Sequence, residues 1–185
     1  VRHGPLEDWA ALGAYRPPNP RNPFYFERLE AEMSGRKRRG KFAGSRTEDR
    51  YVVVTSHFNL IERLHMLHGF RRTMLDFYLE PEKIERVLDL VLEHKIALFT
   101  ELHRRFGDRV HGLFLTDDWG SQQTTFVSGK LFDEFFAPRY RELNAAIHSL
   151  GYHSILHSCG RVNDFVQRFI DGGFDVLNLQ QPRLY

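Results

Sequence analysis

The sequence predicts an α/β fold in which a parallel β-sheet is covered by helices. From residue 51 onward, apolar runs of strand length alternate with stretches of helical periodicity. The clearest unit lies near the end of the chain, with a strand over 152–157, a helix over 162–171 and a strand over 174–178. Apolar strands that alternate with helices are typical of parallel sheets with right-handed βαβ connections.

Residues 1–50 are expected to form an arm and a short helix ahead of the sheet. Five of the eight prolines stand at positions 5, 17, 18, 20 and 23, so this segment should run extended across a surface, without helix or central strand. A short helix is expected over 24–33. The basic run Arg36 to Lys41 resembles a nucleic-acid patch, but it contains no aromatic residue, so we interpret it as a solvated loop that binds no nucleic acid.

The first strand is expected at residues 51–55, which form a β-branched run. Helical periodicity follows over 60–67 and again over 71–79. Pro81 suits the first position of a long helix, and Gly107 provides its C-terminal stop. Together these segments predict a strand, two shorter helices and one long helix.

The next strand is expected at residues 110–116. Ser128 is a candidate N-cap for a helical region that breaks near Pro138, resumes to Leu150 and ends at Gly151. With the two strands of the terminal βαβ unit, the sequence predicts four parallel strands in chain order. Residues 51–185 would therefore form a parallel sheet covered by helices.

Polar clusters follow three successive strands of this sheet, at 117–123, 157–160 and 178–182. The carboxyl ends of parallel strands meet at one edge, and in a (β/α)₈ barrel that rim carries the active site. A core cysteine and a capping aspartate have no reason to recur at the same end of each strand. The pattern therefore predicts a functional site at this rim.

His157 and Cys159 are candidate metal ligands at this rim. Residues i and i+2 of an extended segment point to the same side, and imidazole with thiolate suits zinc. The alternative is that Cys159, the only cysteine, is a small buried hydrophobic residue.

Asp117 and Asp118 are adjacent candidate site residues at the end of the preceding strand. Neighbouring side chains on a strand alternate faces, so only one of the two should point into a shared cavity. The alternative is that one of them caps a turn.

Six motifs that span nearly the whole chain in order resemble the uroporphyrinogen decarboxylase family. They are His3-Gly4-Pro5-Leu6, Leu67-His68-Gly69-Phe70, Asp117-Asp118-Trp119-Gly120-Ser121-Gln122, Phe136-Ala137-Pro138-Arg139-Tyr140, His157-Ser158-Cys159-Gly160, and Asp175-Val176-Leu177-Asn178 with Gln181-Pro182. The resemblance implies a (β/α)₈ barrel, of which the four strands predicted over residues 51–185 would form about half. It also implies one of two activities: decarboxylation without cofactor or metal, or zinc-dependent transfer of a methyl group between a corrinoid and a thiol.

The resemblance favours the methyltransferase branch. His157 and Cys159 match the first two zinc ligands of that branch, whose third ligand would lie beyond Tyr185. Decarboxylases carry a tyrosine in a Tyr-Met-x-x-Gly segment, where this chain has His65-Met66-Leu67-His68-Gly69. Their catalytic aspartate and their arginine segment would precede residue 1, so the sequence does not test them.

The first hypothesis is a zinc-dependent methyltransferase, in which Asp117 or Asp118 is catalytic and orients a ligand. The expected substrate-binding residues are Trp119, Gln122, His65, Asn178 and Gln181. The methyl donor would be a methylcorrinoid on a partner protein. The second hypothesis is a decarboxylase in which Asp117 stabilises charge on pyrrole nitrogens. The third is a binding protein that keeps the rim but lacks a complete ligand set.

The composition indicates the cellular compartment in which the protein works. One cysteine excludes an internal disulfide, and no apolar run approaches the ~20 residues of a membrane span, so we expect a cytoplasmic protein with no membrane partner. The absence of an initiator methionine and the count of four strands predict a piece of a longer polypeptide. Such a half barrel would expose two strand edges and should associate in solution.

Overall fold

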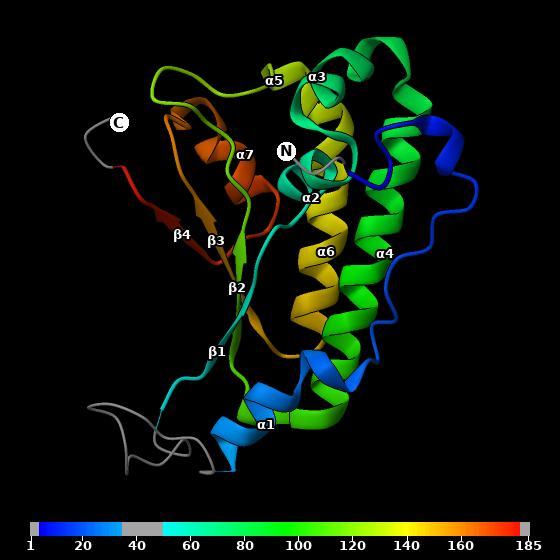
Figure 1. Cartoon of the computed structure of the whole chain (residues 1–185). Coiled ribbons are helices and arrows are strands. Elements are labelled where there is room, and N and C mark those ends of the chain that lie inside the picture. Colours follow the sequence, from blue (N-terminus) through cyan, green and yellow to red (C-terminus); the bar gives the residue numbers. More distant parts are fainter. Residues whose placement is uncertain (1–3, 35–49, 182–185) are drawn as a thin grey trace.

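The computed structural model describes residues 4–34 and 50–181. Its centre is a sheet of four parallel strands in chain order, namely β1 (Val53–Ser56), β2 (Gly112–Thr116), β3 (His153–Ser158) and β4 (Val176–Leu179) (Figure 1). In this register Thr116 lies beside His157, and His157 lies beside Asn178. The predicted strands, their direction and their order are confirmed, which supports the half-barrel interpretation.

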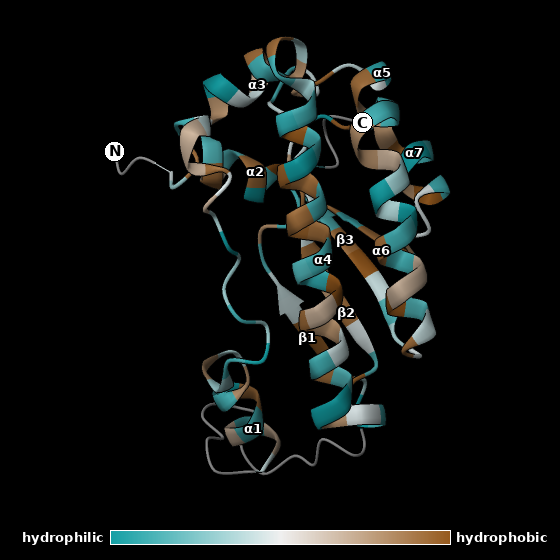
Figure 2. Ribbon diagram, turned by 90° about the vertical axis from the view of Figure 1, so that its right-hand side faces the viewer, coloured by the Kyte–Doolittle hydropathy of each residue, from teal (hydrophilic) through white to brown (hydrophobic). Residues whose placement is uncertain are grey.

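The helices lie on one face of this sheet, where Figure 2 shows α4 and α6 in front of the strands. Their bounds are α1 (Glu27–Met33), α2 (Ile61–His68), α3 (Phe70–Leu79), α4 (Pro81–Phe106), α5 (Gly129–Leu131), α6 (Ala137–Ser149) and α7 (Val166–Asp171). Pro81 begins α4, where its missing N–H is not needed, and Gly107 follows α4 with a φ of 52°. Among the described residues, no helix combines the length and apolarity that crossing a bilayer would need.

The two faces of the sheet differ because strand side chains alternate. Leu113, Leu115 and Leu156 are fully buried against the helices. On the opposite face, Phe114 and Ile155 are only partly covered. The main core therefore lies between the strands and helices α4 and α6, and the described residues cover the other face of the sheet less completely.

The helical region after Ser128 differs from the sequence-based expectation. A break was expected near Pro138, but a wide turn over 132–136 connects α5 to α6 without interruption. In this turn the N–H of Ala137 donates to the carbonyl of Phe132, five residues earlier. Pro138 cannot donate a helical hydrogen bond, and the wide turn before it accommodates this without ending the helix.

The arm is also less extended than its prolines suggested. Short 3₁₀ turns form at Trp9–Ala11 and Pro23–Tyr25, because the side chains of Asp8 and Asn22 accept hydrogen bonds from the first turn in each case. The expected short helix is present as α1. The basic run Arg36 to Lys41 lies outside the described residues.

The start of the arm is fastened to α2 and α3. Leu6 is fully buried, and its N–H donates to the carbonyl of Leu67 over 2.8 Å. The ring nitrogens of His68 lie 2.7 Å from the carbonyl oxygen of Leu6 and 2.8 Å from Oδ2 of Asp76. Trp9 stacks on the His68 ring with centroids 3.7 Å apart. These contacts hold the arm beside the rim.

Replacing Leu88 by alanine should lower the free energy of unfolding by about 2–5 kcal/mol, because Leu88 is fully buried on α4 and its loss leaves a cavity in the core. The matched control is Leu79→Ala, at a side chain that is 70% exposed at the end of α3. Urea unfolding measures both. Equal destabilisation by the two variants would contradict the assignment of α4 to the core.

Candidate metal centre

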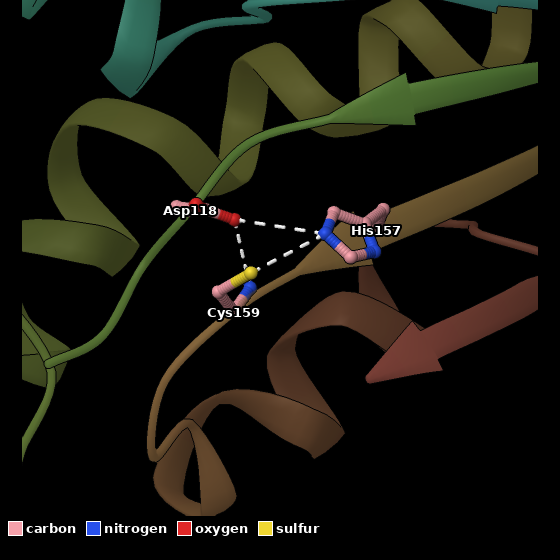
Figure 3. A group of neighbouring side chains, drawn as sticks. All are labelled: Asp118, His157 and Cys159. Carbon is pink, nitrogen blue, oxygen red and sulfur yellow. Dashed lines mark hydrogen bonds and ion pairs between the residues drawn. The ribbon is translucent and has the colours of Figure 1, made fainter. Parts of the chain in front are cut away.

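The end of β3 brings His157 and Cys159 together. His157 is on the strand, and Cys159 follows Ser158, which is the last residue of the strand. Sγ of Cys159 lies 3.4 Å from Nε2 of His157. Figure 3 shows the two side chains turned toward the same point. The i and i+2 spacing thus places both groups on one side of the chain, as the sequence suggested.

Asp118, which follows the end of β2, completes a group of three. Its Oδ1 accepts a hydrogen bond from the N–H of Cys159 over 2.7 Å and lies 4.0 Å from Nε2 of His157 (Figure 3). The candidate ligand atoms of Asp118, His157 and Cys159 all lie within 4.8 Å of one another. The resemblance implied a third ligand beyond Tyr185, whereas the described residues offer Asp118 beside the first two.

Asn178 on β4 orients the imidazole of His157. Its Oδ1 lies 2.7 Å from Nδ1 of His157, so Nδ1 carries the proton and the lone pair of Nε2 faces Cys159 and Asp118. This contact follows from the register, which pairs the two residues across neighbouring strands. Phe114 stacks on the other side of the ring, with centroids 5.8 Å apart.

The loop after β3 is fixed by a close approach of two glycines. Gly160 has a φ of 86°, and a Cβ at this position would stand 2.1 Å from the carbonyl oxygen of Gly120. Only glycine fits there. The N–H of Gly160 donates to Oε1 of Gln181 over 2.7 Å, and Sγ of Cys159 lies 3.4 Å from Oε1 of Gln180. The loops after β2, β3 and β4 are thereby held together at the rim.

The chemistry of the three side chains fits a zinc ion. One imidazole nitrogen, one sulfur and one carboxylate oxygen are the donors that zinc takes in proteins. Burial first, and then the charge of Asp118, raise the pKa of Cys159 to about 11, so the thiol by itself is protonated at neutral pH. A cation at Sγ would favour the thiolate instead.

Asp117 faces the helices rather than the metal centre. Its carboxylate is fully buried and accepts hydrogen bonds from the N–H groups of Leu60 (2.8 Å), Ile61 (3.2 Å) and Glu62 (2.9 Å), and from the hydroxyl of Tyr140. It therefore caps α2, and burial raises its pKa to about 7. Of the two neighbouring carboxylates, only that of Asp118 reaches the metal centre. The catalytic role predicted for Asp117 stays a prediction.

The other residues predicted to bind substrate lie in different places. Trp119 is fully buried among helices, its Nε1 donates to Tyr140 Oη over 3.0 Å, and it does not reach the metal centre. Gln122 is exposed in the loop after β2. Asn178 contacts His157 at the end of β3, and Gln181 contacts Gly160 in the loop that follows. No contact in the structure tests the substrate-binding roles of these residues.

His65 lies on α2, apart from the three candidate ligands. Its ring meets the edge of Phe70 with centroids 4.7 Å apart, and Phe126 lies 6.4 Å away. Nε2 is buried without a hydrogen-bond partner among the described residues. Burial lowers the pKa of His65 to about 4, so the ring is neutral at physiological pH.

Glu62 is a rim residue that the sequence reasoning did not identify. It lies in the first turn of α2, where its Oε2 accepts a hydrogen bond from the hydroxyl of Thr116 over 3.2 Å. Burial first, and then the charge of Asp118, raise its pKa. The available signal was an acidic residue in the first turn of a helix that directly follows a strand at the same rim.

These features define a parallel β/α protein of barrel type with a polar site at its carboxyl rim. A family model described as uroporphyrinogen decarboxylase (URO-D) matches residues 53–182, which is most of the chain. The chain therefore belongs to the uroporphyrinogen decarboxylase family, whose members are generally enzymes. A comparison with curated proteins found no match.

Asn178→Ala should weaken zinc binding by about 10- to 100-fold, because a histidine ligand loses the acceptor that fixes its ring. Asn178→Asp keeps an acceptor and should bind zinc at least as well as the wild type. Competition with a chromophoric chelator measures both affinities. Asn163→Ala, at an exposed position, is the control. Unchanged affinity in Asn178→Ala would contradict the proposed role of the contact.

His65→Phe should make the protein less sensitive to acid. The folded-state pKa of His65 is about 4, below its ordinary 6.5, so the unfolded chain binds the proton more tightly. Stability that is fully present above pH 6.5 is therefore lost as the pH falls toward 4, by about 2 kcal/mol at pH 5. Urea unfolding at pH 5 and 7.5 should show a smaller loss in the variant. Equal losses would show that His65 is not buried in neutral form.

Proposed function

We propose that this protein is a zinc-dependent methyltransferase that moves a methyl group between a corrinoid and a small thiol. The observation that carries the proposal is the convergence of Asp118, His157 and Cys159, whose ligand atoms lie within 4.8 Å of one another. The family alone leaves methyl transfer and decarboxylation open. A nitrogen, sulfur and oxygen donor set favours the metal-dependent branch, because decarboxylation in this family needs no metal.

The zinc ion would be held by Nε2 of His157, Sγ of Cys159 and a carboxylate oxygen of Asp118. Bound at this site, zinc supplies a Lewis acid that lowers the pKa of a substrate thiol. Asn178 keeps the Nε2 lone pair of His157 directed at the site, and Cys159 gives up its proton when the ion binds. Three protein ligands leave a position for the substrate sulfur, as in other catalytic zinc sites.

The reaction would then be a nucleophilic displacement at the methyl carbon. The substrate sulfur forms the new carbon–sulfur bond, the cobalt–carbon bond of the methylcorrinoid breaks with its electron pair left on the corrinoid, and the thiol proton passes to solvent. The donor would approach the carboxyl rim, where Phe114 stacks on the ring of His157. We place the corrinoid on a partner protein and the reaction in the cytoplasm, where thiols stay reduced.

Decarboxylation of a porphyrinogen is supported less well. Asp117, the carboxylate that would stabilise charge on pyrrole nitrogens, is fully buried and occupied by α2 and Tyr140. His65 stands where the resemblance places a tyrosine in the decarboxylases, and its imidazole is packed in a cluster with Phe70 and Phe126. Both residues are thus engaged in packing rather than turned toward a shared cavity.

The test combines metal content with methyl transfer. The purified chain should hold about one zinc ion and should demethylate methylcobalamin in the presence of 2-mercaptoethanol, followed by absorbance. Cys159→Ser and Asp118→Asn should lose zinc and activity together. Asp108→Asn replaces an exposed aspartate at the far end of β2 and should retain both.

Two results would overturn the proposal. One is a protein that contains no zinc yet decarboxylates a porphyrinogen, which would assign it to the other branch. The other is zinc content that is unchanged in Cys159→Ser, which would place the metal elsewhere. Zinc binding without methyl transfer to any thiol tested would favour the binding-protein hypothesis.

A further inference from the structure

A cavity lies on the helix side of β1, apart from the candidate metal centre. Its volume is about 570 Å³, within the range of small-molecule sites, and none of the three candidate metal ligands lines it. The arm, β1, α2 and α4 enclose it. Most of its wall is apolar, with Tyr25, Phe26 and Leu29 from the arm and Val91, Leu98 and Leu102 from α4.

Lys95 of α4 brings a buried cation to this cavity. The residue is only 3% exposed, and its Nζ donates to Oγ of Ser56 over 2.9 Å and to the carbonyl of His57 over 3.1 Å. An ammonium group has three donors, so one is left without a partner among the described residues. Lys95 also forms no ion pair with a carboxylate in the described part of the chain.

Two further basic side chains face the same cavity. Arg63 lies on α2 with its guanidinium 5.7 Å from the centre of the Phe58 ring, and it forms no ion pair within the described ranges. Nδ1 of His94 is buried without a hydrogen-bond partner there. No aspartate or glutamate is found among the described residues that line the cavity. Arg63 and protonated Lys95 therefore give the cavity its positive charge, whereas burial first, and then the charges of Lys95 and Arg63, lower the pKa of His94 and favour its neutral ring.

Burial makes this arrangement costly for Lys95. Loss of hydration first, and then the charge of Arg63, lower the pKa of Lys95 to about 7. The charges of Asp117 and Glu62, which do not line the cavity, raise it. A buried charge is stable when an opposite charge pairs with it and accepts its hydrogen bonds. An anion in the cavity would accept the free donor of Lys95 and balance Arg63.

We propose that this cavity is a binding site for a small organic anion with a single carboxylate and an apolar body. The carboxylate would pair with Lys95 and Arg63, and the alkyl or aryl body would lie against the apolar wall. The polar groups of the wall are few, so one carboxylate fits better than a multiply charged phosphate, which needs more donors. The proposal is independent of the methyl-transfer reaction, because it uses none of the three candidate metal ligands.

The first test uses three probes with the same chain length and different head groups. In calorimetric titration of the 185-residue chain, octanoate should bind at one saturable site. Neutral 1-octanol should bind about tenfold more weakly, since it lacks the charge-assisted hydrogen bond. Octylammonium should not bind. Equal affinity for the three probes, or no binding of octanoate, would overturn the proposal.

The second test uses variants that separate charge from space. Lys95→Met keeps the length of the side chain and should lose octanoate binding, whereas Lys130→Met, at an exposed lysine of α5, should keep it. Leu98→Trp retains Lys95 but fills the cavity, so it should also lose binding. Circular dichroism confirms folding, and if Lys95→Met does not fold, Leu98→Trp decides. Binding that survives in a folded Lys95→Met or in Leu98→Trp would overturn the proposal.

Discussion

The carboxylate of Asp117 is the contact on which the arrangement of the rim depends. It accepts hydrogen bonds from three backbone N–H groups that open α2, and from the hydroxyl of Tyr140 on α6. One buried side chain at the end of β2 therefore sets the position of two helices. Because consecutive residues face opposite sides, the same backbone places Asp118 toward His157 and Cys159. The residue that caps α2 and the residue that reaches the candidate metal centre are thus neighbours at the end of β2.

The parallel register places polar residues of three neighbouring strands side by side at the rim. His157 lies between Thr116 and Asn178, so each neighbouring strand contributes one polar group to the environment of the candidate metal centre. The close approach of Gly120 and Gly160 brings the following loops together. Each of these contacts is made by residues far apart in the chain. The donor geometry therefore depends on the sheet being formed, and metal binding should be coupled to folding.

Charged groups near the rim act on the helix-side cavity, although they do not line it. Burial first, and then the charge of Arg63, lower the pKa of Lys95, whereas Asp117 and Glu62 near the rim raise it. Neither carboxylate forms a direct ion pair with Lys95, whose Nζ donates among the described residues to Ser56 and His57 alone. Arg63 and protonated Lys95 therefore keep a positive charge in the helix-side cavity.

The sequence by itself determined the alternation of strands and helices, the parallel order, and the placement of His157 and Cys159 on one side of a strand end, because these follow from local periodicity and spacing. It also indicated that only one of two adjacent aspartates would face a shared site, but not which one. Only the tertiary structure decided that Asp118 reaches the metal centre, that Trp119 is core, and that Lys95 and Arg63 meet in a cavity. Each of these depends on which face of a segment the packing of distant helices covers, and no local pattern specifies that.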